Sequence, residues 1–161
     1  MPSALVRGAL AGALGTLAMD AVWFARYRRG GGKSAFAEWE FGAPAESWDE
    51  APAPARMGRL LARKLLGAEL GPERIRLVNN VMHWGYGLVW ATQYDLLRSR
   101  VRSRLWHGPA FGATVWASDY VVLPLAGIYE PIWKYDPGTL WQDLSAHLVF
   151  GTATDAALRV L

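Results

Sequence analysis

The chain has 161 residues, of which 52% are hydrophobic and 12% aromatic, and its formal net charge is +3 at pH 7. This length is ordinarily that of one domain, and the apolar content is enough for a packed interior. The sequence contains no cysteine, which excludes disulfides, thiol redox centres and thiolate metal sites. No nucleic-acid-binding motif is recognisable, and anionic lipid headgroups explain basic residues beside apolar stretches, so no nucleic-acid partner is expected.

The first apolar stretch, residues 4–24, is long enough to cross a bilayer as a helix. Glycines recur in it at helical spacing, at Gly8, Gly12 and Gly15. A stripe of small residues lets a neighbouring helix approach closely, as is typical of helix packing in membranes. We therefore expect this helix to pack through its glycines.

The connection that follows, residues 27–71, is too polar to cross a membrane. Its acidic pair Glu38 and Glu40 is interpreted as part of a solvated or interfacial segment. Residues 55–66 then show a helical pattern with one apolar face and one basic face, which predicts an amphipathic helix in the membrane interface. Its predicted lipid-contacting residues are Arg56, Arg59 and Arg63.

Three further stretches have membrane-spanning length: residues 78–97, 108–129 and 139–158. The second of these carries a single charge, Asp119, which fits a bilayer crossing, whereas the other two are mixed and would also suit a soluble helix. Gly112 and Gly151 are predicted packing positions in the last two. The pattern predicts an all-α protein, a single membrane domain over residues 1–161 built as a four-helix transmembrane bundle with an interfacial helix. A soluble helical bundle is the alternative.

Arginines concentrate in the connection between the second and third predicted spans, which has no acidic residue. They are Arg98, Arg100, Arg102 and Arg104. Lysine and arginine favour the cytoplasmic side of a membrane, so this connection and both termini are expected there. The first connection is also basic and opposes that orientation. Anionic headgroups are the expected partners of these arginines.

Five ionisable residues lie inside the predicted spans: Asp20, His83, Asp119, His147 and Asp155. An ionisable group in hydrocarbon is costly, so each is a candidate functional residue. A rise of about 1.5 Å per residue places Asp20 and His83 at similar depth. The same estimate puts Asp119 nearest the midplane and Asp155 toward the far side. The five are predicted to form a polar ladder across the core.

A ladder of carboxylates and imidazoles suits conduction of protons or a small polar solute, because burial can bring their pKa values together. Hydrogen bonding between helices explains the same residues without transport. The protein is therefore expected to be a homo-oligomeric conductor or, as an alternative, an accessory subunit of a larger membrane complex. No phosphate loop, serine elbow or zinc motif is present, so no enzymatic activity is expected.

No cofactor or metal is predicted as the first choice. A haem b held by His83 and His147 is an alternative, since two axial histidines are a known mode of haem ligation. A metal bound by these histidines together with Asp119 is another.

Short motifs in the C-terminal half resemble the YagU-like family of uncharacterised bacterial inner-membrane proteins. These motifs are Trp106-His107-Gly108, Gly112, Pro124-Leu125-Ala126-Gly127-Ile128 with Pro131, and His147-Leu148-Val149. The resemblance lies mainly in residues 79–151. It implies a multi-pass protein of the bacterial inner membrane with cytoplasmic termini, and it implies no settled activity.

Overall fold

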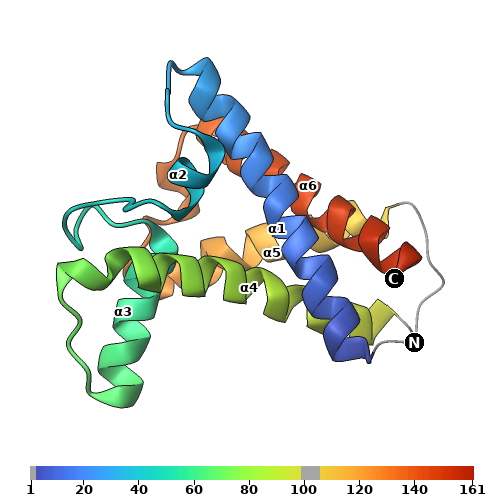
Figure 1. Ribbon diagram of the computed structural model, residues 1–161, viewed down its shortest axis with the longest axis horizontal. Helices are drawn as coiled ribbons and strands as arrows, with labels where there is room; N and C mark the ends of the chain where they lie inside the picture. The colour runs from blue at the N-terminus through green and yellow to red at the C-terminus, as the bar shows by residue number, and fades with distance from the viewer. Residues whose placement is uncertain (1–2, 99–105) are drawn as a thin grey trace.

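The computed structural model describes residues 3–98 and 106–161, in which helices and turns make up all the regular structure and no strand occurs (Figure 1). The prediction of an all-α protein is confirmed. The long helices are α1 (Ala4–Arg29), α4 (Ile75–Arg98), α5 (His107–Leu125) and α6 (Pro137–Val160). The connections contain α2 (Phe36–Phe41), α3 (Ala53–Leu66) and the 3₁₀ turns η1 (Pro72–Arg74) and η2 (Ile132–Lys134).

Local sequence determines several helix ends. The Ser3 side chain accepts a hydrogen bond from the backbone N–H of Val6 at the start of α1. Asp136 caps α6 in the same way, with proline at the first helical position. The predicted stretch of residues 108–129 was expected to be helical to its end, but α5 ends at Leu125. The chain turns at Gly127, where φ is +70°.

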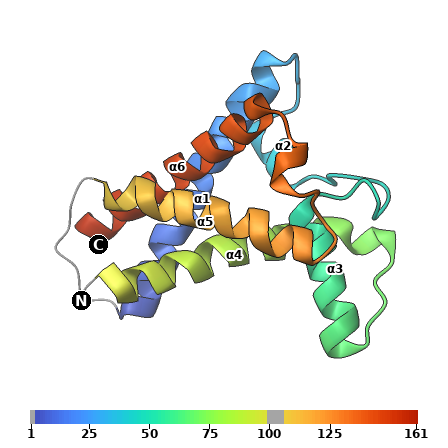
Figure 2. The same ribbon diagram turned by 180° about the vertical axis from the view of Figure 1, so that it is seen from behind.

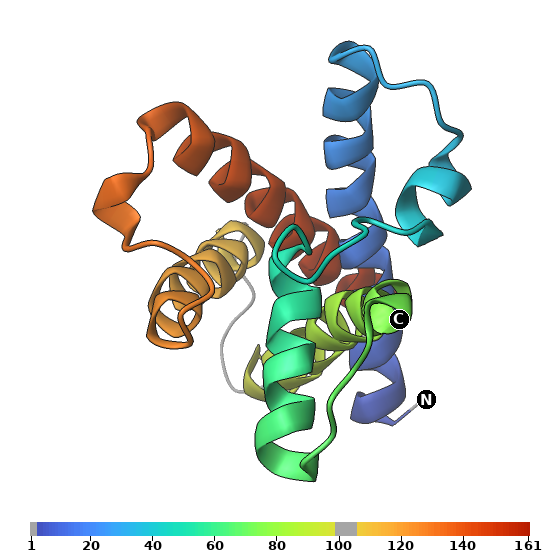
Figure 3. The ribbon, with the colours of Figure 1, turned by 90° about the vertical axis from the view of Figure 1, so that its left-hand side faces the viewer.

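The four long helices meet at one end of the bundle and separate at the other. Near both chain termini all four come together, whereas their opposite ends diverge (Figures 1 and 3). Close packing joins α1 to both α4 and α6, and joins α5 to α6. Seen from behind, α5 lies between α4 and α6 (Figure 2). Aromatic rings rather than close backbones join α4 to α5, for example Tyr94 stacked on Phe111 with ring centroids 4.2 Å apart.

Glycines make the close contacts of α1 with α4 and α6, and of α5 with α6. A Cβ added to Gly12 would lie 2.7 Å from the carbonyl oxygen of Gly87 in α4. A Cβ on Gly112 would overlap the carbonyl of His147 in α6. Gly151 lies against the backbone of α5, at Gly108 and Gly112. The helices therefore approach as closely as their backbones allow, as in small-residue packing between membrane helices.

Large apolar side chains cover the outside of α1, α4 and α5. Their exposed fractions include 65% for Leu5, 51% for Leu14, 61% for Val81, 56% for Val89 and 60% for Val121. Several polar residues are buried together with the apolar core: Thr16, Asp20, Asp95, Thr154 and Asp155. Single exposed apolar residues are normal in soluble proteins, but an extended apolar surface marks contact with a membrane or a partner.

Among the described helices, α1 alone is both long and apolar enough to cross a membrane by length and composition. The core helix of a soluble protein and a signal sequence share this character. Polar residues inside α4, α5 and α6 lower the hydropathy of those helices. Insertion of all four helices is therefore a proposal, taken up below from the distribution of apolar and polar side chains.

The predicted amphipathic helix corresponds to α3, which packs on α4 through Gly58 and a buried cluster around Trp48 and Ile75. Two of its arginines contact protein groups instead of facing outward. Arg56 donates to the carbonyl of Ile128 at 3.0 Å, and the Arg59 guanidinium lies 5.1 Å from the Trp48 ring centroid. These contacts arise because the chain folds back over α3, which the helical pattern does not show.

Where the four long helices meet, a cluster of ion pairs (the ion cluster) joins α1 to α4 and α4 to α6. Asp95, only 1% exposed, binds Arg7 at 2.8 Å. Asp155 binds Arg98 at 3.1 Å and Arg159 at 2.6 Å. Arg98, predicted to contact lipid, thus neutralises buried carboxylates. The predicted lipid-contacting residues Arg100, Arg102 and Arg104 lie outside the described residues.

Substituting Gly112 by alanine tests the close contact of α5 with α6. The added Cβ has no room beside the His147 backbone, so we expect a loss of about 1–3 kcal/mol in stability. Gly85→Ala is the matched control, because no atom lies within 4 Å of its added Cβ, and it should be neutral or slightly stabilising. Thermal unfolding in mild detergent, followed by circular dichroism, measures both. Equal midpoints for the two variants would contradict this packing.

Substituting Arg7 by methionine tests the ion cluster. Breaking a buried ion pair typically costs about 3–5 kcal/mol, and we expect the lower end because Arg98 remains 3.8 Å from Asp95. Arg74→Met removes the exposed pair with Glu73 and should cost at most about 1 kcal/mol. Chemical denaturation compares the two variants, and similar losses would show that the cluster does not hold the helices together.

Candidate functional site

The first histidine group joins α1 to α4. Nε2 of His83 lies 2.9 Å and 3.1 Å from the two carboxylate oxygens of Asp20, which is 2% exposed. The sequence placed these residues at similar depth but could not show which way each helix faces. The glycine contacts between α1 and α4 fix that rotation, and they turn the two side chains toward each other.

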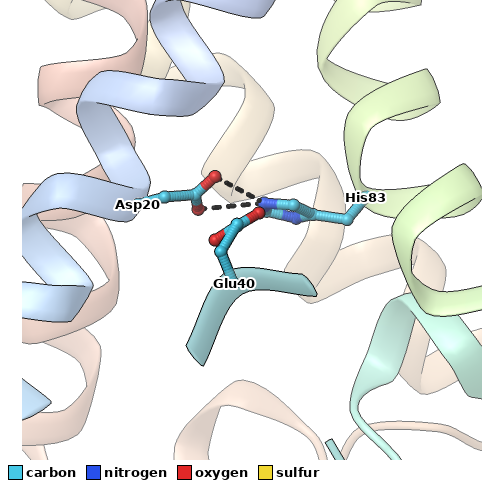
Figure 4. A group of neighbouring side chains, drawn as sticks. All are labelled: Asp20, Glu40 and His83. Atoms are coloured by element: carbon cyan, nitrogen blue, oxygen red, sulfur yellow. Dashed lines mark hydrogen bonds and ion pairs between the residues drawn. The ribbon is translucent and has the colours of Figure 1, made fainter. Parts of the chain in front are cut away.

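Glu40 of α2 completes this group. One possible metal-ligating atom from each of Asp20, Glu40 and His83 lies within 4.8 Å of the other two. The three side chains converge from separate helices (Figure 4). Trp84 donates to Oε1 of Glu40 at 2.9 Å. Burial, followed by the neighbouring Asp20 carboxylate, raises the pKa of Glu40 above its ordinary value. Glu40 was interpreted as part of a solvated segment, and only the alternation of acidic and aromatic residues around it gave a signal.

The second histidine group joins α5 to α6. Nε2 of His147 lies 3.3 Å from Asp119, and Nδ1 lies 2.9 Å from the backbone carbonyl of Asp143 and 3.3 Å from its carboxylate. A carbonyl oxygen only accepts hydrogen bonds, so Nδ1 carries a proton. The Tyr86 hydroxyl donates to Asp119 at 2.6 Å. The sequence analysis did not include Asp143, although it lies one helical turn before His147.

Two adjoining cavities connect the two groups. His83, His147, Asp119 and Asp143 line a cavity of about 310 Å³, together with Tyr86. His83 also lines a cavity of about 960 Å³ with Asp20 and Glu40. Both groups therefore face the space between the diverging helix ends, and His83 belongs to both cavities.

Asp155, the fifth residue of the predicted ladder, lies apart from the other four. It belongs to the ion cluster with Arg98 and Arg159, where Tyr94 also donates to it at 2.8 Å. A buried apolar cluster of Phe111, Val115 and Phe150 occupies the middle of the bundle. The structure thus arranges the five predicted residues as two histidine–aspartate pairs and one separate aspartate that is paired with arginine.

The two histidines do not face a common ligand. Nε2 of His83 is directed to Asp20, and Nε2 of His147 is directed to Asp119. This arrangement gives no support to a bis-histidine haem, which needs both nitrogens on one iron. The group of Asp20, Glu40 and His83, in contrast, brings metal-ligating atoms together.

No family model, curated protein or solved structure matches the chain. The resemblance to the YagU-like family stays a prediction.

Glu40→Gln tests the environment of the first histidine group. The folded state binds the Glu40 proton more tightly than the unfolded state, so Glu40 lowers folded stability as pH rises through its raised pKa. Relative to the variant, the wild type should gain stability on acidification from about pH 7 to about pH 4. Thermal unfolding in detergent across this range measures the difference. The control is Glu38→Gln, which changes an exposed neighbour in the same helix. Parallel curves of stability against pH for Glu40→Gln and the wild type would contradict a raised Glu40 pKa.

Proposed function

We propose that the protein is a multi-pass membrane protein of the bacterial inner membrane whose interior conducts protons or a small polar solute. One observation carries this proposal: two histidine–carboxylate groups from all four long helices line adjoining cavities in a bundle with apolar side chains on its outer surface. Ionisable residues in such a position mark ion and proton pathways in membrane proteins.

The distribution of side chains supports insertion in a membrane. Exposed leucine and valine side chains on α1, α4 and α5 would contact lipid, while glycines fill the helix contacts. Exposed tryptophans lie at or beside the ends of the long helices, as expected for residues at the level of lipid headgroups. They are Trp106, Trp133 and Trp141, with exposed fractions of 79%, 79% and 62%.

Hydrogen-bond geometry supports proton transfer through the cavities. Asp20 and His83 are within direct proton-transfer distance of each other. Tyr86 lies one turn beyond His83 on α4 and donates to Asp119, which in turn faces Nε2 of His147. Asp119 thus contacts side chains of both α4 and α6, and we assign it the central role in the path.

The apolar cluster of Phe111, Val115 and Phe150 separates this path from the ion cluster. Apolar constrictions of this kind gate channels by excluding water. The buried hydroxyls of Thr16 and Thr154 lie beside Phe150, and neither has a hydrogen-bond partner among the described residues. In the proposed mechanism, water enters this layer when the aromatic side chains move, and the two hydroxyls then bind it.

Asp119→Asn tests the proposed function in reconstituted vesicles. An amide cannot take up the proton that a carboxylate accepts, so we expect proton flux to fall to the level of empty vesicles. The control is Asp49→Asn, at an exposed position in the first connection, which should conduct like the wild type. Size-exclusion chromatography verifies that both variants assemble. Wild-type flux in a well-assembled Asp119→Asn protein would refute the proposal.

A further inference from the structure

We propose that Asp20, Glu40 and His83 form a binding site for a divalent transition-metal ion that binds nitrogen and oxygen ligands, such as Zn²⁺. The three residues belong to α1, α2 and α4, and one donor atom from each lies within 4.8 Å of the other two. Figure 4 shows the Asp20 carboxylate facing the His83 ring nitrogen, with the Glu40 carboxylate beside them. Ligating atoms lie about 2.0–2.2 Å from a zinc ion, so only a modest contraction of this group is needed.

Glu40 is the ligand best able to make that adjustment. It comes from a short helix in a connection, whereas Asp20 and His83 are fixed by the packing of two long helices. Trp84 already holds Oε1 of Glu40 through its indole N–H. Hydrogen bonds of this kind orient a carboxylate ligand and leave its other oxygen for the metal.

The charges of the group favour a divalent ion. The Asp20 and Glu40 carboxylates lie close together, and His83 can supply at most one compensating positive charge. Arg26 lines the same cavity, but its guanidinium donates to the carbonyl of Gln142 and the hydroxyl of Ser145. A divalent ion beside neutral His83 would balance both carboxylates. One imidazole and two carboxylates suit zinc, iron or manganese rather than a metal that selects thiolates.

A further polar side chain lines the same cavity. Asn79 lies one helical turn before His83 on α4 and lines the same cavity. Its Oδ1 is buried and has no hydrogen-bond partner among the described residues. An amide oxygen there can accept a hydrogen bond from water on the metal. The cavity of about 960 Å³ supplies the entry path and the open coordination positions that three protein ligands leave.

This inference goes beyond the proposed function and does not require proton conduction. The proposed metal ligands belong to the first histidine group, whereas Asp119, the central residue of the proton path, belongs to the second. Binding is measured without a proton gradient. Loss of flux with intact binding, or the reverse, therefore separates the two proposals.

Calorimetric titration of the purified full-length protein with Zn²⁺ in mild detergent tests the site. We expect one zinc ion per chain in the wild type and no binding in His83→Gln. Glu40→Gln should weaken binding at least about tenfold. The control is His147→Gln, which changes the other buried histidine and should bind zinc like the wild type. Circular dichroism verifies the fold of each variant, and Glu40→Gln, in a short connecting helix, keeps the test decisive if His83→Gln unfolds.

Absence of zinc binding in the wild type would overturn the proposal. So would an undiminished affinity in Glu40→Gln, or a loss of binding in His147→Gln with retention in His83→Gln.

Discussion

The backbone of α1 lies directly against α4 and α6 because glycines leave no side chain between them, and this contact positions the buried polar groups of α1. Gly12 meets Gly87 of α4, and Gly15 meets Thr154 and Phe150 of α6. Such close approach fixes the rotation of each helix about its axis. It turns Asp20 toward His83 in the interior and leaves the leucines of α1 on the outside.

The two ends of the bundle use charge differently. At the end near the termini, Asp95 and Asp155 are each neutralised by arginine, and the helices are held together. At the other end, carboxylates pair with histidine instead of arginine. The helices separate there, cavities open, and Glu40 enters from a connecting segment. One end is therefore suited to a structural role and the other to binding or proton exchange.

Sequence patterns predicted the elements well and the tertiary contacts poorly. Apolar length located the four long helices, and the amphipathic pattern of residues 55–66 located α3, because these signals are local. The partners of Asp155 and the recruitment of Glu40 could not be predicted, since both depend on helix rotation and on the path of a connection. Asp143 gave a usable signal: its spacing of four residues from His147 places the two on one helical face.

Membrane insertion as proposed places the outer face of α4 against lipid and its inner face on a water-accessible cavity. The sequence has no cysteine, so single cysteines introduced into α4 can be labelled with a membrane-impermeant maleimide in vesicles. Met82→Cys probes the cavity, and Val89→Cys probes the outer face, where Val89 is 56% exposed. The account predicts that Met82→Cys reacts and that Val89→Cys does not. Faster labelling of Val89→Cys, as its exposure would require in a water-soluble bundle, would contradict it.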